Sequence, residues 1–164
     1  MIVVVMGVSG CGKTTIGRAL ADAMGWAFLD ADDFHPGANV AKMRAGTPLT
    51  DDDRWPWLDR LAAEMSAINA RGASAVLGCS ALRQAYRDRL ARAGGVRIVY
   101  LKGDRATIEP RLAARAGHYM PPSLLTSQFA ALEEPADVIV VDIRLPAPRQ
   151  VQAIRDALTL SCPP

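Results

Sequence analysis

The sequence predicts a single α/β domain in which a parallel five-stranded sheet is flanked by helices. Short apolar runs alternate with segments of helical periodicity along all 164 residues. The runs contain few polar residues, which is typical of parallel strands buried on both faces. A chain of this length can bury one substantial core, and it contains no internal repeat or linker. The expected strands span residues 2–6, 26–30, 74–79, 96–101 and 138–142.

The first strand leads into a glycine-rich loop that fits G-x-x-x-x-G-K-[ST] at every fixed position. The glycines let backbone N–H groups turn inward, and a helix beginning near Lys13 adds its unpaired amides to this anion site. Lys13 can reach the β- and γ-phosphates, and the Thr14 hydroxyl can ligate Mg²⁺. A strand before the loop and a helix after it argue against a turn that binds nothing. The sequence therefore predicts a nucleoside triphosphate site formed by Gly7, Val8, Ser9, Gly10, Cys11, Gly12, Lys13, Thr14 and Thr15.

The helix after this loop is expected over residues 15–24, because apolar residues recur there at helical spacing, and Gly25 is a suitable C-cap. The second strand is followed by a polar segment over residues 32–50, with helix expected around residues 39–44. This segment is too long for a simple connector, so we expect a substrate-binding insertion.

Five further helices are expected in the rest of the chain. A capping box over residues 50–53 predicts a helix that runs to about Arg71. The segment over residues 116–122 contains Gly117, His118 and two adjacent prolines, and is expected to form a short exposed lid. The remaining helices are expected over residues 81–93, 106–115, 123–132 and 151–160.

Composition narrows the function classes. The net charge of +2 is small and the basic residues are scattered, so no nucleic-acid surface is expected. No apolar run has the length of a membrane span, and the first residues lack the basic leader of a signal peptide. Three cysteines without paired spacing favour reduced thiols and a cytoplasmic location. Cys79 is expected to be buried and Cys162 to be a tail residue, so Cys11 alone is expected where chemistry can reach it.

The combined motifs resemble those of the bacterial gluconate kinases from residue 2 to residue 142. Cys11 departs from the family, which usually has serine there, and Arg83 stands where lysine is common. Besides the phosphate loop, the matching segments are Phe28-Leu29-Asp30-x-Asp32, His35-Pro36, Asp51-Asp52-Asp53-Arg54, Cys79-Ser80-Ala81-Leu82-Arg83, Tyr86-Arg87-Asp88, Arg115-x-Gly117-His118, Gln128-Phe129 and Leu132-Glu133.

This resemblance implies the P-loop fold of nucleoside-monophosphate kinases. It also implies ATP and Mg²⁺ as cosubstrates, and phosphorylation of D-gluconate on its terminal hydroxyl to give 6-phospho-D-gluconate and ADP. A homodimer is expected on the same ground, and no membrane or nucleic-acid partner is.

Two carboxylates follow the second strand, at the edge of an open α/β sheet where ligands bind. By resemblance, Asp32 contacts the attacking hydroxyl and can accept its proton, and Asp30 helps to hold Mg²⁺ through water. Both carboxylates could instead cap the next helix. His35 is expected to bind substrate hydroxyls, with ordering of its loop as the alternative.

Several arginines are candidates for anion recognition. By resemblance, Arg54 points toward the substrate carboxylate, which a guanidinium can grip with two hydrogen bonds. Arg83 and Arg87, four apart on one expected helix face, form a second candidate clamp, with a solvated face as the alternative for Arg87. Asp51, Asp52 and Asp53, in contrast, are expected only to cap a helix.

Arg111 and Arg115 are one helical turn apart and directly precede the expected lid. They can place two cations near the transferring phosphoryl group, or one cation against the adenine ring. Favourable charge near a helix C-terminus is the alternative.

Two rival functions were weighed against a gluconate kinase. A GTP-dependent switch needs N-K-x-D, but Leu101 stands at the amide position of Leu101-Lys102-Gly103-Asp104, and the one D-x-x-G match lies on a helix. A sibling kinase of the same fold, acting on shikimate, another small hydroxy acid or a nucleoside monophosphate, is closer. Only the resemblance favours gluconate over these substrates.

Overall fold

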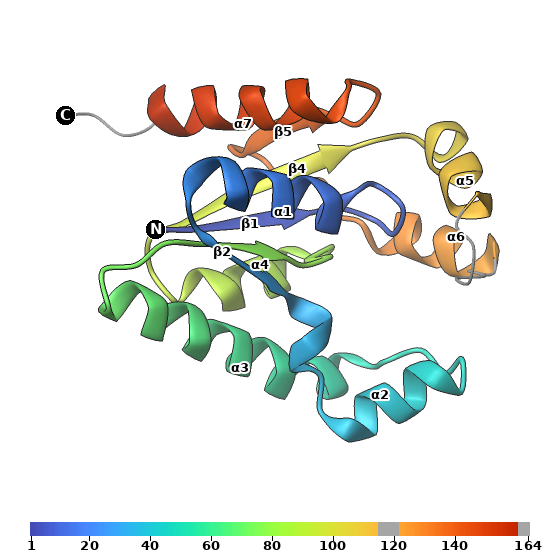
Figure 1. The fold of residues 1–164 in the computed structure, drawn as a ribbon. Helices are drawn as coiled ribbons and strands as arrows, with labels where there is room; N and C mark the ends of the chain where they lie inside the picture. The colour runs from blue at the N-terminus through green and yellow to red at the C-terminus, as the bar shows by residue number, and fades with distance from the viewer. Residues whose placement is uncertain (115–121, 161–164) are drawn as a thin grey trace.

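The computed structural model describes residues 1–114 and 122–160. Its five strands form one parallel sheet in the order β2-β3-β1-β4-β5, which confirms the predicted fold class (Figure 1). The strands are β1 (Ile2–Met6), β2 (Ala27–Asp30), β3 (Ala75–Gly78), β4 (Val96–Lys102) and β5 (Ile139–Asp142). The helices are α1 (Lys13–Met24), the 3₁₀ turn η1 (Ala31–Phe34), α2 (Gly37–Arg44), α3 (Asp51–Ala70), α4 (Gln84–Ala91), α5 (Arg105–Ala113), α6 (Pro122–Ala131) and α7 (Ala147–Leu160).

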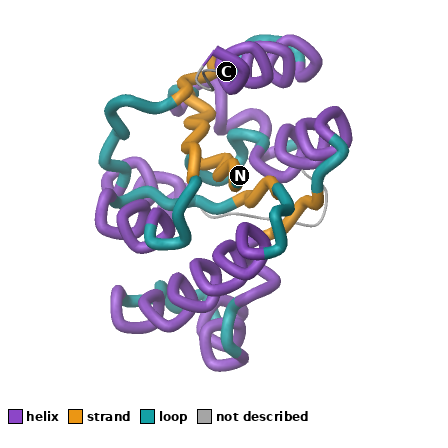
Figure 2. Tube along the Cα trace, turned by 90° about the vertical axis from the view of Figure 1, so that its left-hand side faces the viewer, coloured by secondary structure: helices purple, strands orange, loops and turns teal. Residues whose placement is uncertain are grey.

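Strand β1 is the centre of the sheet, and all five of its residues are fully buried. Its side chains alternate between two cores, as the period of a strand requires. Val3 and Val5 pack with α1 and α7 on one face, and Ile2, Val4 and Met6 pack with α3 and α4 on the other. Figure 2 shows the strands as a layer between these helices. This burial places the loop after β1 in the middle of one edge of the sheet.

The edge strands β2 and β5 are less buried than the sequence predicted. Val140 in β5 is 54% exposed, and no residue of β2 is fully buried. The expectation that every strand is buried on both faces is therefore wrong for the two edges, which have a neighbouring strand on one side only.

Helix boundaries were predicted well where a local cap specifies them. Gly25 ends α1 in the left-handed conformation, and Thr50 with Asp53 forms the expected capping box of α3. The start of α4 at Ala81 was wrong, because Ala81 has a φ of 43° and Arg83 is an extended N-cap. Helix α7 begins at Ala147 rather than at residue 151. Pro148 is compatible with this earlier start, because the N–H groups of a first helical turn have no partner within the helix.

The expected insertion over residues 32–50 contains η1 and α2, and leads into α3. An ion pair ties α2 to the start of α3, because Lys42 Nζ donates to both oxygens of Asp53 at 2.7 and 2.8 Å. This contact, with the capping bonds from Thr50, lowers the pKa of Asp53 to about 2. The lid expected over residues 116–122 lies outside the described residues except for Pro122, which begins α6. Among the residues that the structure describes, no helix is long and apolar enough to cross a membrane.

Candidate active site

The loop between β1 and α1 has the backbone of an anion site. Gly7, Gly10 and Gly12 all have positive φ, at 144°, 82° and 103°. A Cβ on Gly7 would come within 2.9 Å of the Leu101 carbonyl oxygen, so a larger residue would have to push the backbone of β4. Helix α1 has no side-chain cap, which leaves its first amides to the loop.

Lys13 folds back over this loop. Its Nζ donates to the carbonyl oxygens of Gly7 and Val8, at 3.1 Å each. An ammonium group has three donors, so these two bonds leave one donor for a phosphate oxygen. The expected phosphate-binding role of Lys13 therefore agrees with its position.

The two candidate magnesium ligands lie next to each other. Thr14 Oγ1 is 3.4 Å from Asp30 Oδ2, at the end of β2. Asp30 Oδ1 also accepts the Asp32 N–H at 3.2 Å and caps η1, so the structure gives Asp30 the capping role as well. The described residues contain no group of three carboxylate, histidine or cysteine ligands. This donor set fits Mg²⁺, which commonly takes one or two protein oxygens and completes its shell with phosphates and water.

The side chain of Asp32, directly after β2, is open to a substrate, since 85% of it is exposed. Partial desolvation by its surroundings, together with the nearby charge of Asp30, raises the pKa of Asp32. Lys13 and His35 act in the opposite direction through their positive charge. A raised pKa makes a carboxylate a better proton acceptor.

His35 is held by the protein on several sides. Its ring stacks on Trp57 with centroids 4.2 Å apart, and its Nδ1 lies 3.3 Å from Asn39 Nδ2. Burial lowers the pKa of His35, and the side chain is only 5% exposed. Its Nε2 lies 3.9 Å from Asp32 Oδ1. These contacts favour the loop-ordering alternative, with Nε2 directed to Asp32.

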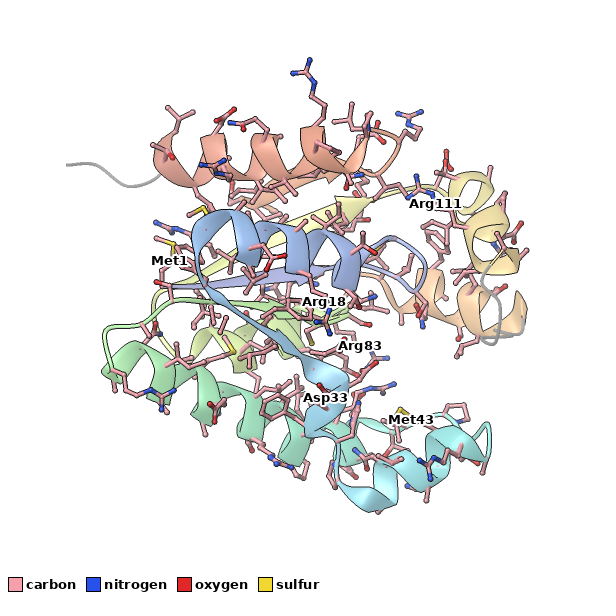
Figure 3. The ribbon with its side chains drawn as sticks, viewed as in Figure 1. Met1, Arg18, Asp33, Met43, Arg83 and Arg111 are labelled. Atoms are coloured by element: carbon pink, nitrogen blue, oxygen red, sulfur yellow. The ribbon has the colours of Figure 1, made fainter. Side chains whose placement is uncertain are left out.

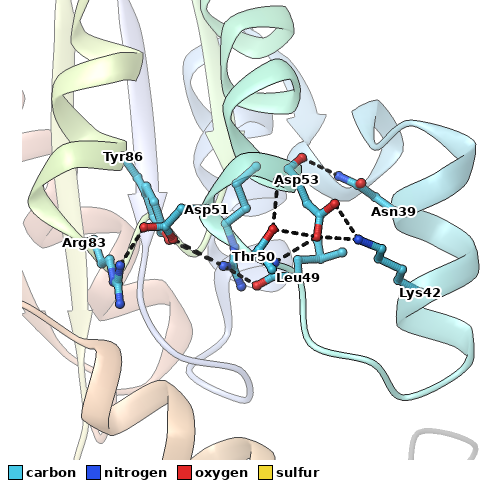
Figure 4. A network of polar contacts seen from close by, with 9 residues as sticks. Asn39, Lys42, Leu49, Thr50, Asp51, Asp53, Arg83 and Tyr86 are labelled. Atoms are coloured by element: carbon cyan, nitrogen blue, oxygen red, sulfur yellow. Dashed lines mark hydrogen bonds and ion pairs between the residues drawn. The ribbon is translucent and has the colours of Figure 1, made fainter.

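Both candidate carboxylate-binding arginines lie next to Asp51 and Tyr86, and Figure 4 shows Arg83 with these two residues. Arg83 Nη1 donates to Asp51 Oδ2 at 2.8 Å, and the Tyr86 hydroxyl donates to Asp51 Oδ1 at 2.5 Å. Arg54 Nη1 donates to the Leu49 carbonyl oxygen at 2.6 Å and lies 3.5 Å from the Tyr86 hydroxyl. Arg54 also lowers the pKa of His35 through its charge, which places it beside the Asp32 segment.

The predicted Arg83–Arg87 clamp is wrong. Arg83 precedes α4, whereas Arg87 is inside it and only 4% exposed. The Arg87 guanidinium donates to the carbonyl oxygens of Ala81, Leu82 and Glu133 at 2.9 to 3.0 Å. Arg87 is therefore neither an anion ligand nor part of a solvated face. It joins the segment after β3 to the segment after α6.

Arg111 points from α5 to the segment after β5, where its Nη2 donates to the Ile143 carbonyl oxygen at 2.8 Å. The positive charge of Arg111 acts on Cys11 in the phosphate loop. It lowers the pKa of the Cys11 thiol, although burial raises that pKa by more. Figure 3 shows Arg83 and Arg111 on the same side of the molecule, toward which the strands point. Arg115, the other predicted cation, lies outside the described residues, as does His118.

Cys11 is not accessible to chemistry, contrary to expectation. It is 1% exposed, and burial raises the pKa of its thiol, so it stays protonated. Its backbone remains part of the loop, with Cys11 N–H donating to the Val8 carbonyl oxygen at 3.3 Å.

Sequence reasoning assigned no role to Gln128, which belongs to the site. Gln128 Oε1 accepts the Ser9 N–H at 2.6 Å, and Gln128 Nε2 donates to Ser9 Oγ at 2.9 Å. The two residues are 119 positions apart, so only the Gln128-Phe129 motif of the family resemblance could have pointed to it.

The arrangement brings together a glycine-rich loop, a lysine, an exposed carboxylate and two arginines along one edge of the sheet. Hydrogen bonds fasten the loops of this edge to each other, because Gly7 N–H donates to the Ser80 carbonyl oxygen and Glu133 N–H donates to that of Leu82. Chemically, this site can bind a polyphosphate and activate a hydroxyl of a small anionic substrate.

The chain is similar to known kinases. A family model described as an AAA domain matches residues 2–136. A gluconokinase from Gluconobacter oxydans (strain 621H) is 50% identical over 140 residues, which are 82% of this chain and 76% of that relative.

Two solved structures are also similar. A sugar kinase from Janibacter sp. HTCC2649 has a TM-score of 0.90 and 46% identity, covering 98% of this chain and 95% of that one. A gluconokinase from Sinorhizobium meliloti 1021 has a TM-score of 0.85 and 39% identity, covering 96% of this chain and 94% of that one.

Proposed function

This chain belongs to the gluconokinase family, and on that premise we propose that it transfers the γ-phosphoryl group of ATP to the terminal hydroxyl of D-gluconate. The products are 6-phospho-D-gluconate and ADP. The proposal rests on a set of neighbouring groups that reaches from the phosphate loop to two arginines. Lys13 and His35 both act on Asp32 through their charge, Arg54 acts in the same way on His35, and Arg54 shares Asp51 and Tyr86 with Arg83. Such a site has a binding group for each reacting or charged part of the two substrates: the phosphates of ATP, and the hydroxyl and the carboxylate of gluconate.

Asp32 is the proposed proton acceptor. The hydroxyl oxygen forms a bond to the γ-phosphorus, its proton passes to the Asp32 carboxylate, and the bond from phosphorus to the ADP oxygen breaks. ADP leaves with that electron pair. The raised pKa of Asp32 supports this role. His35 supports it by position, since its Nε2 lies 3.9 Å from the same carboxylate.

Lys13 and the phosphate loop are proposed to hold the triphosphate. The amides of residues 7–15 and the Lys13 ammonium balance charge that grows on the phosphate oxygens during transfer. Thr14 and Asp30 would hold Mg²⁺, which, when bound, neutralises part of the phosphate charge. Arg111 and Arg115 are proposed to act on the phosphoryl group or the adenine. The electrostatic effect of Arg111 on Cys11, a residue of the phosphate loop, supports this role for Arg111.

Arg54 and Arg83 are proposed to bind the gluconate carboxylate. Arg83 is 45% exposed and Arg54 is 31% exposed, so both guanidinium groups are open to a ligand although each is already held by the protein. Shikimate also has a carboxylate and a hydroxyl, so these charges alone do not favour gluconate over it. The identity to gluconokinases decides between the two substrates.

The proposal is tested by ADP release with gluconate, shikimate and a nucleoside monophosphate, each with ATP and Mg²⁺. Of the three substrates, we expect only gluconate to be turned over. Lys13→Ala should abolish this turnover while its circular dichroism spectrum stays unchanged. Faster turnover with shikimate or with the nucleotide would contradict the proposal.

Two further expectations depend on the family resemblance and on the cysteine content. A homodimer is expected from the resemblance, and sedimentation velocity would measure it. A cytoplasmic location is supported by the unpaired cysteines, of which Cys11 and Cys79 are both free and buried in the described part of the chain.

A further inference from the structure

Asp51 holds both arginines of the candidate carboxylate site in place. Its two oxygens are divided between two partners on α4 and the segment before it. Oδ2 accepts from Arg83 Nη1 at 2.8 Å, and Oδ1 accepts from the Tyr86 hydroxyl at 2.5 Å. Arg54 Nη1 lies 3.8 Å from Oδ1 and 3.5 Å from the same hydroxyl. Asp51 thus lies between Arg83 and Arg54 and is connected to both.

These contacts occupy only one nitrogen of each guanidinium. Within the described residues, the hydrogen bonds and ion pairs of Arg54 and Arg83 all involve Nη1. The Nη2 and Nε donors of each arginine therefore remain for a ligand. A guanidinium presents its donors in a rigid fork, so fixing one nitrogen also orients the others.

Asp51 does not perform the capping role that its position at the start of α3 suggests. Asp53 forms the capping box with Thr50 and also binds Lys42. Asp52, in the same first turn, is exposed and has no hydrogen bond or ion pair with another described side chain, so it contributes charge near the helix N-terminus. The three consecutive aspartates therefore differ in what they touch, and Asp51 alone faces the arginines.

We propose that Asp51 is a positioning residue for substrate recognition, which fixes Arg83 directly and Arg54 through the Tyr86 hydroxyl so that their free donors converge on the substrate carboxylate. The proposal rests on the proposed function, because it requires that these arginines bind gluconate. It adds that the site needs an acidic residue to recognise an acidic substrate. Without Asp51, Arg83 would keep its charge but lose this hydrogen bond, and the Tyr86 hydroxyl beside Arg54 would lose its acceptor, while the bond from Arg54 to the Leu49 carbonyl oxygen would remain.

The test compares Asp51→Asn with the matched control Asp52→Asn. Both variants remove one negative charge from the first turn of α3, so they change the helix dipole interaction equally. Asp51→Asn weakens hydrogen bonds that join charged groups, and these contribute more binding free energy than neutral ones. The KM for gluconate should therefore rise ~10-fold or more in this variant. The KM for ATP should stay within twofold, and Asp52→Asn should match the wild type.

A second variant keeps the test independent of folding defects in the first. Tyr86→Phe removes only the hydroxyl that joins Asp51 to Arg54, and should also raise the KM for gluconate while leaving kcat and the KM for ATP unchanged. Glucose, which lacks a carboxylate, provides a further control, because its kcat/KM should not change in either variant. A structural defect would lower the use of both sugars together.

Unchanged KM for gluconate in Asp51→Asn would overturn the proposal, and so would a lower KM, which would mean that Asp51 competes with the substrate. Equal effects of Asp51→Asn and Asp52→Asn would also overturn it, because only charge would then matter.

Arg83→Met distinguishes failure of this proposal from failure of the proposed function. If Arg83→Met raises the KM for gluconate and Asp51→Asn does not, only the positioning role is wrong. If neither variant affects it, the carboxylate site itself is wrong.

Discussion

The side-chain amide of Gln128 binds Ser9 of the phosphate loop through both of its ends. Oε1 accepts the backbone N–H at 2.6 Å, and Nε2 donates to the hydroxyl oxygen at 2.9 Å. Gln128 lies on α6, the helix that follows the expected lid. One side chain thus connects the anion loop to the lid side of the site.

Replacing Gln128 is therefore expected to affect nucleotide binding. Gln128→Ala should raise the KM for ATP about 10-fold, since two hydrogen bonds that order the loop are lost. The KM for gluconate should stay near its wild-type value. Ser127→Ala is the matched control, because the Ser127 hydroxyl bonds only within α6, to the Leu124 carbonyl oxygen at 2.8 Å. An unchanged KM for ATP in Gln128→Ala would show that the loop does not depend on this contact.

Asp32→Asn tests the proton acceptor. The amide keeps the shape of the side chain but cannot take the proton, so kcat should fall ~100-fold or more while the KM for ATP changes little. Asp33→Asn, which removes a neighbouring exposed carboxylate, should keep most of the turnover. If Asp32→Asn raises only the KM for gluconate and keeps kcat, Asp32 is a binding residue.

The pH dependence of kcat/KM for gluconate should show an acidic limb. Protonation of Asp32 removes the acceptor, so activity is lost as pH falls through its pKa, which is raised above the ordinary 3.8. His35 protonates in the same direction, and its pKa is lowered below 6.5. The midpoint of the limb should therefore lie above 3.8 if Asp32 causes it, and below 6.5 if His35 does. In His35→Asn the limb should persist if Asp32 causes it, and a profile that becomes flat would assign it to His35.

Arg87→Met tests the structural role of the buried guanidinium. This change removes the guanidinium donor from the carbonyl oxygens of Ala81, Leu82 and Glu133, of which Leu82 keeps the Glu133 N–H, and should lower the free energy of unfolding by about 3 kcal/mol. Arg89→Met breaks an ion pair with Asp59 near the surface, where solvent screens the charges, and should lower the free energy of unfolding much less. Urea denaturation measures both variants, and equal losses would contradict the structural role of Arg87.

The parts of the site that the sequence predicted are those specified locally. The strand, the glycine loop and the start of α1 form one continuous motif, and Gly25 and Thr50 identify helix ends through their own conformational preferences. The proximity of Asp30 and Thr14 also follows from the sequence. Asp30 ends a strand and Thr14 follows the glycine loop, and both positions are expected at the same edge of the sheet.

The parts that the sequence did not predict depend on long-range contacts or on unusual backbone. The left-handed Ala81 delays α4, and the burial of Arg87 depends on the carbonyl groups of Ala81, just before α4, and of Glu133, 46 positions away. No periodicity distinguishes Asp51 from Asp53, although one binds arginines and the other caps a helix. Helical spacing alone gave Arg87 the wrong role.

Carboxylate recognition by Arg54 and Arg83 is the central claim, and glucose tests it because it offers a similar terminal hydroxyl without the carboxylate. Arg54→Met should reduce kcat/KM for gluconate far more than it affects the KM for ATP. Arg54→Lys should restore only part of the loss, because a point charge does not reproduce the two-pronged grip.

The most direct measurement is the ratio of kcat/KM for gluconate to that for glucose in the wild-type protein. A site built around a charged partner should reject the analogue that lacks it, so we predict a ratio of ~10⁴ or more. A ratio below ten would contradict the account, because the carboxylate would then not select the substrate.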